Sequence, residues 1–121
     1  MKNQAYRMSM LYDFYGELLT PRQREFFDLY YNEDLSLAEI AENNGITRQG
    51  VRDVIVRAEN AMQDVEDKTG IIKRFQSQRP LLDEILSAAV KIKERNALHY
   101  FDPEISELCD KISDAAATLK E

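Results

Sequence analysis

Residues 36–62 read SLAEIAENNGITRQGVRDVIVRAENAM, which is the order of a helix-turn-helix: a short helix, a glycine turn and a second helix. Ser36 is placed to cap the first helix, and Glu39, three residues later, completes a capping box. Gly45 supplies the left-handed backbone conformation in which the chain can reverse. Thr47 is placed to cap the second helix. The stretch therefore predicts a pair of helices whose second member presents its outer side to a partner.

The second helix of this pair separates apolar from polar residues. Its apolar positions recur at steps of three and four and are expected to be buried: Val51, Val54, Ile55, Ala58 and Met62. At about 100° per residue, Gln49 and Asp53 fall near the opposite side of the helix. Arg52 and Arg57 flank this outward side, and Arg48 lies closer to the buried stripe.

The outward residues predict a nucleic-acid surface. In the major groove, arginine can make a bidentate contact to guanine and glutamine can read adenine. Gln49 and Arg52 are therefore the predicted base-reading residues, and Arg48 and Arg57 the predicted phosphate contacts. Asp53 opposes this assignment because phosphate repels its carboxylate, although the carboxylate can accept a hydrogen bond from a cytosine amino group.

The part of the chain before residue 70 reads as further helices separated by turns. Residues 3–19 form the first predicted helix. A second is predicted for residues 20–31, because its opening holds a threonine cap, a first-turn proline and a glutamine that completes a capping box. The helix after Thr47 is expected to reach about residue 68 and to stop at Gly70. The expected buried residues of the first two helices are Met8, Leu11, Tyr12, Tyr15, Leu18, Phe26, Leu29 and Tyr30.

After Gly70 the sequence predicts a connector over residues 71–79, a helix that begins near Pro80, and a second connector over residues 96–102. The run Asp102-Pro103-Glu104 indicates the start of the last helix. The stripes of these two helices are wide: Leu81, Leu82, Ile85, Leu86, Ala88, Ala89, Ile92, Ile105, Leu108, Cys109, Ile112, Ala115, Ala116 and Leu119. The whole pattern predicts an all-α fold, a helix-turn-helix bundle with additional C-terminal helices.

This organisation predicts a helix-turn-helix domain over residues 1–75 and a C-terminal helical segment over residues 76–121. Apolar stripes this wide are not left exposed in a soluble protein, so the tail helices are expected to serve packing or dimerisation. A homodimer that uses both internal packing and contact between copies is the favoured arrangement. A six-helix monomer with every stripe folded inward is the alternative.

The composition indicates a globular, cytoplasmic protein that is not an enzyme. Of 121 residues, 44% are hydrophobic and 31% charged, and no apolar run approaches the roughly 20 residues that span a bilayer. Cys109 lies on an apolar stripe and is expected to be a buried hydrophobe, which suits a reducing compartment. His99 has no metal-ligand partner in its surroundings. No catalytic set or phosphate loop is recognisable, and no cofactor or metal is predicted.

The net charge of −6 constrains any nucleic-acid surface. Residues 1–75 carry ten Lys and Arg against thirteen Asp and Glu, and residues 76–121 carry six against nine. Neither part is basic, whereas proteins that bind nucleic acid gain affinity by neutralising phosphates. A nucleic-acid surface on this chain must therefore be local.

The run TPRQRE at residues 20–25, followed by SLAEIA at 36–41 and TRQGVR at 47–52, resembles the fourth region of bacterial sigma factors. That region binds promoter DNA. It usually continues with further basic residues, whereas this chain continues with Asp53, Glu59 and Asn60.

Over nearly its whole length the chain is more similar to the YlxM family, small acidic proteins of Gram-positive bacteria. The resemblance is carried by MLYDFYGELLT at residues 10–20, DLYY at 28–31 and GITRQGVRD at 45–53. It implies an all-helical DNA-binding protein whose gene lies beside those of the signal recognition particle, with an accessory role in protein targeting.

Three hypotheses follow. The first is a DNA-binding regulator that acts as a homodimer through Arg48, Gln49, Arg52 and Arg57. The second is a non-enzymatic adaptor that binds the protein or the RNA of the signal recognition particle, which suits the acidic balance and Asp53. The third is a dimeric scaffold whose arginines are solvated helix surface.

Overall fold

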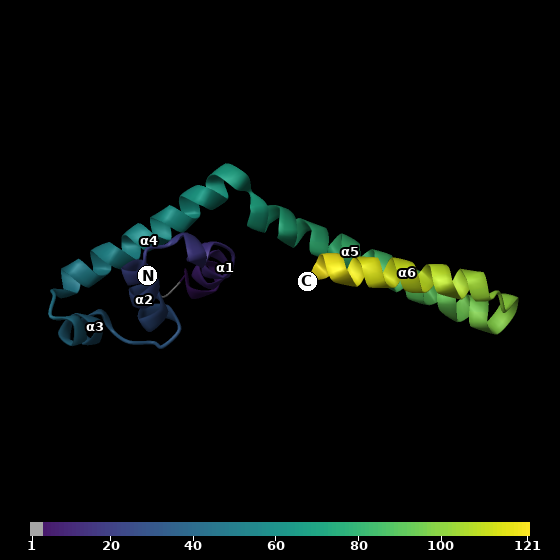
Figure 1. Cartoon of the computed structure of the whole chain (residues 1–121), viewed down its shortest axis with the longest axis horizontal. Coiled ribbons are helices and arrows are strands. Elements are labelled where there is room, and N and C mark those ends of the chain that lie inside the picture. Colours follow the sequence, from purple (N-terminus) through teal and green to yellow (C-terminus); the bar gives the residue numbers. More distant parts are fainter. Residues whose placement is uncertain (1–3) are drawn as a thin grey trace. The chain divides into compact units, whose positions relative to one another are not determined.

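The computed structural model describes residues 4–121, and these form helices without any strand (Figure 1). The elements are α1 (Ala5–Tyr15), the 3₁₀ turn η2 (Gly16–Leu18), α2 (Pro21–Tyr31), α3 (Leu37–Asn44), α4 (Arg48–Thr69), α5 (Ile71–Arg95), the π-helical turn η3 (Asn96–Tyr100) and α6 (Pro103–Lys120). The predicted all-α class, a helix-turn-helix bundle with additional C-terminal helices, is confirmed. The chain divides into two compact units, Met1–Ile72 and Lys73–Glu121. The predicted division into domains 1–75 and 76–121 stays a prediction.

Local side-chain caps start the helices of the first unit. The Thr20 hydroxyl oxygen accepts from the Gln23 N–H at 3.2 Å, and the Gln23 side chain accepts from the Thr20 N–H at 3.0 Å. Ser36 and Glu39 form the same reciprocal pair at 3.1 and 3.2 Å. Each capping residue contributes about 1 kcal/mol to helix stability. Both predicted capping boxes are confirmed.

Two glycines end helices in the left-handed conformation. Gly45 has φ 66° after α3 and Gly70 has φ 63° after α4. Nothing lies within 4 Å of a Cβ built at either position, so the backbone angle and not space is what favours glycine there. The predicted turn at Gly45 and the predicted stop at Gly70 are both confirmed.

Two hydrophobic clusters make the core of the first unit. The first joins α1, α2 and the C-terminal half of α4: Met8, Leu11, Tyr15, Leu19, Phe27, Ala58, Met62 and Ile72. The second joins α2, α3 and the N-terminal half of α4: Phe26, Tyr30, Ile40, Ala41, Val51 and Ile55. Helix α4 therefore runs through both clusters, which fixes which of its sides faces solvent.

Most residues predicted to be buried in this unit are buried, whereas Tyr12, Leu29 and Val54 are half-buried. Leu18 is 68% exposed and Leu19 is buried in its place, because the chain passes from α1 into a 3₁₀ turn. That turn advances about 120° per residue, so the α-helical phase no longer holds there. Phe27, which the predicted stripe omitted, is fully buried and stacks on Tyr12 at 4.7 Å between ring centroids.

The expected connector over residues 71–79 and the helix start near Pro80 are wrong. Helix α5 begins at Ile71, and Pro80 lies inside it. The Ile72 side chain is 7% exposed in the first cluster, and its N–H donates to Glu66 Oε1 at 2.9 Å. These contacts fix the first turn of α5 directly after Gly70. A proline inside a helix costs a backbone hydrogen bond, and the helix continues through it here.

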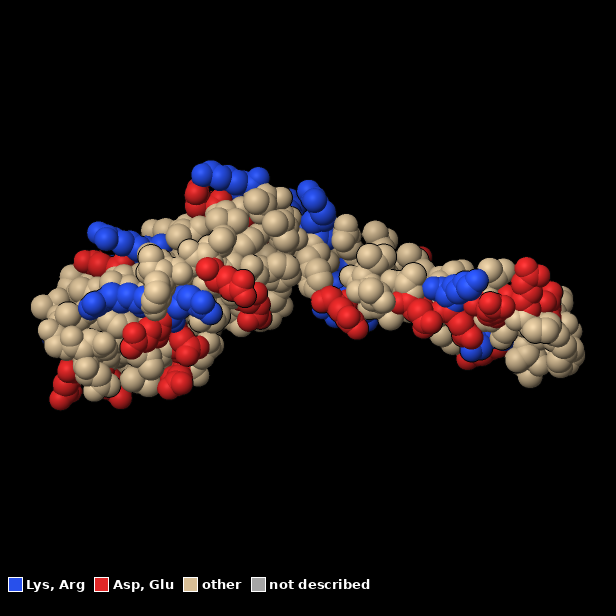
Figure 2. Space-filling view, in the orientation of Figure 1, with Lys and Arg blue, Asp and Glu red and all other residues tan. Residues whose placement is uncertain are grey.

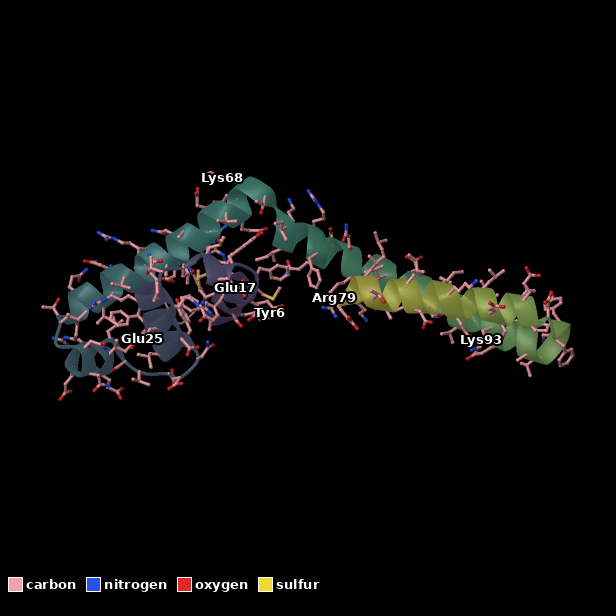
Figure 3. The ribbon with its side chains drawn as sticks, in the orientation of Figure 1. Tyr6, Glu17, Glu25, Lys68, Arg79 and Lys93 are labelled. Atoms are coloured by element: carbon pink, nitrogen blue, oxygen red, sulfur yellow. The ribbon has the colours of Figure 1, made fainter. Side chains whose placement is uncertain are left out.

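In the second unit, α5 and α6 form an antiparallel hairpin (Figure 1). Lys93, which Figure 3 labels on the hairpin, pairs through its Nζ with Asp110 Oδ1 at 2.6 Å, and the carboxylate raises the pKa of the lysine. Lys120 and Asp83 form a second ion pair between the helices. The last helix starts at Pro103, as the run Asp102-Pro103-Glu104 predicted, and Asp102 caps it by accepting from the Glu104 N–H at 2.9 Å.

The predicted connector at 96–102 is largely a π-helical turn. Phe101 follows it with φ 54°. The Asn96 amide donates to the Asp102 carbonyl at 2.6 Å and accepts from the Asp102 N–H at 2.9 Å, so this buried side chain closes the end of the hairpin. His99 is exposed beside the Tyr100 ring. Cys109 is buried at 3% exposure, as predicted.

Candidate nucleic-acid interface

Helices α3 and α4 pack as a helix-turn-helix. Ile40 of α3 and Val51 and Ile55 of α4 are each 0% exposed and lie in one cluster. After Gly45 the chain reverses, and the Ile46 N–H donates to the Ala41 carbonyl at 3.2 Å. The turn between the helices is therefore fixed by backbone hydrogen bonding and by apolar packing.

The start of α4 is held by its cap. The Thr47 hydroxyl oxygen accepts from the Gly50 N–H at 2.9 Å. A Cβ at Gly50 would lie 3.2 Å from that same oxygen and 3.7 Å from the Ile46 side chain. Gly50 thus leaves room for the cap and the turn of its own chain. The two residues between cap and glycine, Arg48 and Gln49, are presented at the first turn.

The four predicted contact residues lie on the exposed part of α4. Arg48, Gln49, Arg52 and Arg57 are all exposed. None of the three guanidinium groups has a hydrogen bond or an ion pair with another residue of 4–121. Gln49 Nε2 donates to Asp53 Oδ1 at 2.9 Å. The carboxylate that phosphate would repel therefore has a neutral hydrogen-bond partner one turn away. All four lie on the N-terminal half of α4, and their contacts with nucleic acid stay a prediction.

Charge changes sign along α4. The exposed charged residues before Asn60 are three arginines and Asp53. After Asn60 the exposed Asp64 pairs with Lys68 at 2.9 Å, and Asp67 accepts from Gln63 at 2.7 Å. Figure 3 marks Lys68 near the C-terminal end of α4, and Figure 2 shows basic and acidic side chains interspersed on the face in view. The cationic part of α4 is thus confined to its N-terminal half, the half of a recognition helix that contacts base edges.

Buried hydrogen bonds anchor the middle of α4. The Tyr31 hydroxyl donates to Glu59 Oε2 at 2.7 Å, and Glu59 is only 8% exposed. Burial, helped by the neighbouring Glu59, raises the pKa of Tyr31 above its ordinary value. Arg7 of α1 hydrogen bonds to Gln63 on the next turn. These contacts fix the rotation of α4 about its own axis, and with it the direction of the arginines.

The structure adds one cationic candidate that the sequence interpretation omitted. Arg22 of α2 is exposed and lies 5.0 Å above the Phe26 ring. Phe26 belongs to the same cluster as Val51 and Ile55, under the N-terminal half of α4. The stacking, though not the place of Arg22 beside the site, could have been predicted from the sequence, because side chains four residues apart on a helix are neighbours.

No arrangement within residues 4–121 suggests metal chemistry. No group of three or more His, Cys, Asp or Glu side chains among them is arranged to hold a metal ion. Across the described chain no helix is both long and apolar enough to cross a membrane.

A buried tyrosine lies near the C-terminal end of α4. The Tyr15 hydroxyl donates to Glu66 at 2.6 Å, and burial raises the pKa of Tyr15.

Comparison with known proteins gives a consistent result. The model of the UPF0122 family, described as "Putative helix-turn-helix protein, YlxM / p13 like", matches residues 2–100. A UPF0122 protein of Thermoanaerobacter sp. (strain X514) is 45% identical over 106 residues, which cover 88% of this chain and 87% of that protein. One of Geobacillus sp. (strain WCH70) is 38% identical over 109 residues, covering 89% and 99%. One of Symbiobacterium thermophilum is 48% identical over 82 residues, covering 68% and 77%.

Proposed function

Because this chain belongs to the UPF0122 family of helix-turn-helix proteins, we propose that it is a non-enzymatic protein that binds duplex DNA through the N-terminal half of α4. One observation carries the proposal. Three exposed guanidinium groups without partners in the described chain stand on the capped first half of the second helix of the motif. Such groups are available to phosphate and to guanine.

Each contact residue has a distinct role in this proposal. Arg52 and Gln49 read base edges, and Gln49 exchanges its hydrogen bond to Asp53 for one to adenine. Arg48 and Arg57 contact phosphates and fix the register on the duplex. Arg22 adds a further phosphate contact from α2.

The proposed setting follows from the resemblances already described. The protein acts in the cytoplasm as an accessory of the signal recognition particle pathway, and its α2–α4 part docks on DNA as region four of a sigma factor does. It acts as a homodimer. Two copies then place their recognition helices one DNA turn apart, roughly 34 Å.

The test is the salt dependence of binding to random duplex DNA. The variant Arg48→Ala/Arg52→Ala is compared with Arg74→Ala/Arg95→Ala, which removes two arginines of α5 that are also exposed. Loss of the one phosphate contact, that of Arg48, lowers the slope of log affinity against log salt by about 0.9, and loss of Arg52 lowers the affinity itself. We expect these changes in the α4 variant and none in the α5 variant. Unchanged affinity of the α4 variant rejects this surface.

A second candidate function is an adaptor that binds the protein or the RNA of the signal recognition particle. It is favoured by the charge of the first unit: residues 1–72 carry eight Lys and Arg against thirteen Asp and Glu, a net −5. An acidic surface complements a basic partner. Titration of the purified particle protein and of the particle RNA, at the same two salt concentrations, tests it. Absence of a complex in both titrations rejects it.

A further inference from the structure

The α5–α6 hairpin leaves most of its apolar surface uncovered. Within 73–121 the fully buried apolar residues are small: Ala89, Cys109 and Ala116. Phe75, Leu82, Leu86 and Ile105 are half-buried. The other large ones are between 45% and 73% exposed: Leu81, Ile85, Val90, Ile92, Leu98, Tyr100, Phe101, Leu108, Ile112 and Leu119. Two helices alone cannot cover stripes this wide, so part of this surface is available to a partner.

Each helix carries two apolar seams that are one residue apart. The inner seam, which packs the two helices of the hairpin together, contains Leu82, Leu86, Ala89, Ile105, Cys109 and Ala116. The outer seam lies one position earlier on each helix, at the four-three-four spacing of helices that pack lengthwise: Leu81, Ile85, Ala88, Ile92, Leu108, Ile112, Ala115 and Leu119. All eight residues of the outer seam are exposed.

The two outer seams lie on the same side of the hairpin. A step of one residue back turns the side chain by about 100° about the helix axis. Since α5 and α6 run in opposite directions, the same backward step on each helix points to a common face. Leu81 and Leu119 indeed line one groove together with Gln78 and Leu82. We call the eight outer-seam residues the outer face.

We propose that the outer face is covered by the outer face of a second copy of this chain, so that the two hairpins form a four-helix bundle. A helix in such a bundle contacts two neighbours at about a right angle, which two seams about 100° apart provide. Contact of the same patch on both copies is the arrangement of a two-fold dimer. The inference rests on the homodimer of the proposed function, gives it a contact surface and needs no nucleic acid.

The size of the outer face suits this occupant. The 18 residues of α6 make a helix roughly 27 Å long, and two helices side by side are roughly 20 Å wide. The flat area is on the order of 500 Å² per copy, so a dimer buries on the order of 1,000 Å² in total, the lower size limit of specific interfaces.

The charge of the hairpin also favours a second copy over a strongly charged partner. Residues 73–121 carry eight Lys and Arg against nine Asp and Glu, a net −1, whereas residues 1–72 carry −5. Two hairpins therefore meet with almost no net repulsion. The two ion pairs between α5 and α6, Lys93–Asp110 and Lys120–Asp83, neutralise four of these groups within one copy.

The test is the mass of the full chain in solution, measured by sedimentation at several concentrations. Wild type is expected to have the mass of two chains. Ile85→Lys/Ile112→Lys places two charges in the outer face and is expected to halve that mass. Val90→Lys adds one charge and is the control matched in exposure, because Val90 is 50% exposed, like Ile85 at 45% and Ile112 at 46%. Val90 lies one position after the inner seam and faces the other side. The control is expected to keep the mass of two chains.

The inference is overturned if wild type has the mass of one chain. It is also overturned if Val90→Lys has the mass of one chain, or if Ile85→Lys/Ile112→Lys keeps the mass of two. Circular dichroism of each variant checks that its helices are formed, and the changed side chains are exposed, so folding is expected to survive. The failure of this inference is separable from that of the DNA proposal. A dimer without arginine-dependent DNA binding contradicts only the DNA contact. Arginine-dependent binding by a monomer contradicts the homodimer and its outer face but leaves the DNA contact standing.

Discussion

At the scale of single residues, the pair Tyr31–Glu59 decides how α4 is held. Glu59 is almost fully buried, and the Tyr31 hydroxyl donates to it at 2.7 Å. A buried carboxylate that loses a donor retains its desolvation cost. We expect Tyr31→Phe to lower the free energy of unfolding by about 1–3 kcal/mol in urea denaturation. Tyr100→Phe, at a position that is 72% exposed, is the control and should leave the stability unchanged.

The raised pKa of Tyr31 predicts that the folded protein loses stability at alkaline pH. The pKa of Tyr31 in the folded protein lies above its ordinary value of 10.0, so the folded state holds the phenol proton more tightly than the unfolded chain does. This contribution is complete below pH 10.0 and is lost as the pH rises beyond it. Stability measured between pH 9 and 11 should therefore fall less steeply in Tyr31→Phe than in wild type. An equally steep fall in both proteins contradicts this account.

At the scale of elements, Pro80 tests the continuity of α5. Proline is favourable at the first position of a helix but costs about 3 kcal/mol in its interior. Since Pro80 lies inside α5, Pro80→Ala should raise the free energy of unfolding by roughly 1–3 kcal/mol. Pro103→Ala is the control, because Pro103 occupies the first turn of α6 and its removal should give no gain. Equal effects of the two changes would mean that a helix starts at Pro80.

The elements also show what the sequence can predict. Caps and glycine turns depend on residues within one turn of each other, so the signals at Thr20, Ser36 and Thr47 sufficed to predict three helix starts. Pro80 suits a helix start and a tolerated interior position alike, and only the tertiary contacts of Ile72 distinguish them.

In the candidate site, features that depend on spacing within one helix could be predicted from the sequence, and one that depends on packing between helices could not. The exposed positions of Arg48 and Arg52 follow from helical periodicity, and the pairing of Gln49 with Asp53 follows from a spacing of four residues. The place of Arg22 beside the site depends on Phe26 joining the cluster under α4, which is a long-range packing contact. Periodicity within one helix carries no information on such a contact.

At the scale of the whole molecule, stability should depend on concentration if the outer face joins two copies. Binding between folded chains shifts unfolding by mass action. The melting temperature followed by circular dichroism should rise with protein concentration in wild type and in Val90→Lys. It should stay constant in Ile85→Lys/Ile112→Lys. If the melting temperature of wild type does not change with protein concentration, the two copies do not stabilise each other, and the prediction is wrong.

The carboxylate of Glu66 has a mechanical consequence. Its Oε1 accepts one hydrogen bond from the Tyr15 hydroxyl at 2.6 Å and another from the Ile72 N–H at 2.9 Å. Because Ile72 lies in the first turn of α5, this oxygen ties the start of that helix to the first unit. Through the Tyr15 hydroxyl it also ties the start of α5 to α1, fifty-one residues before Glu66 in the chain.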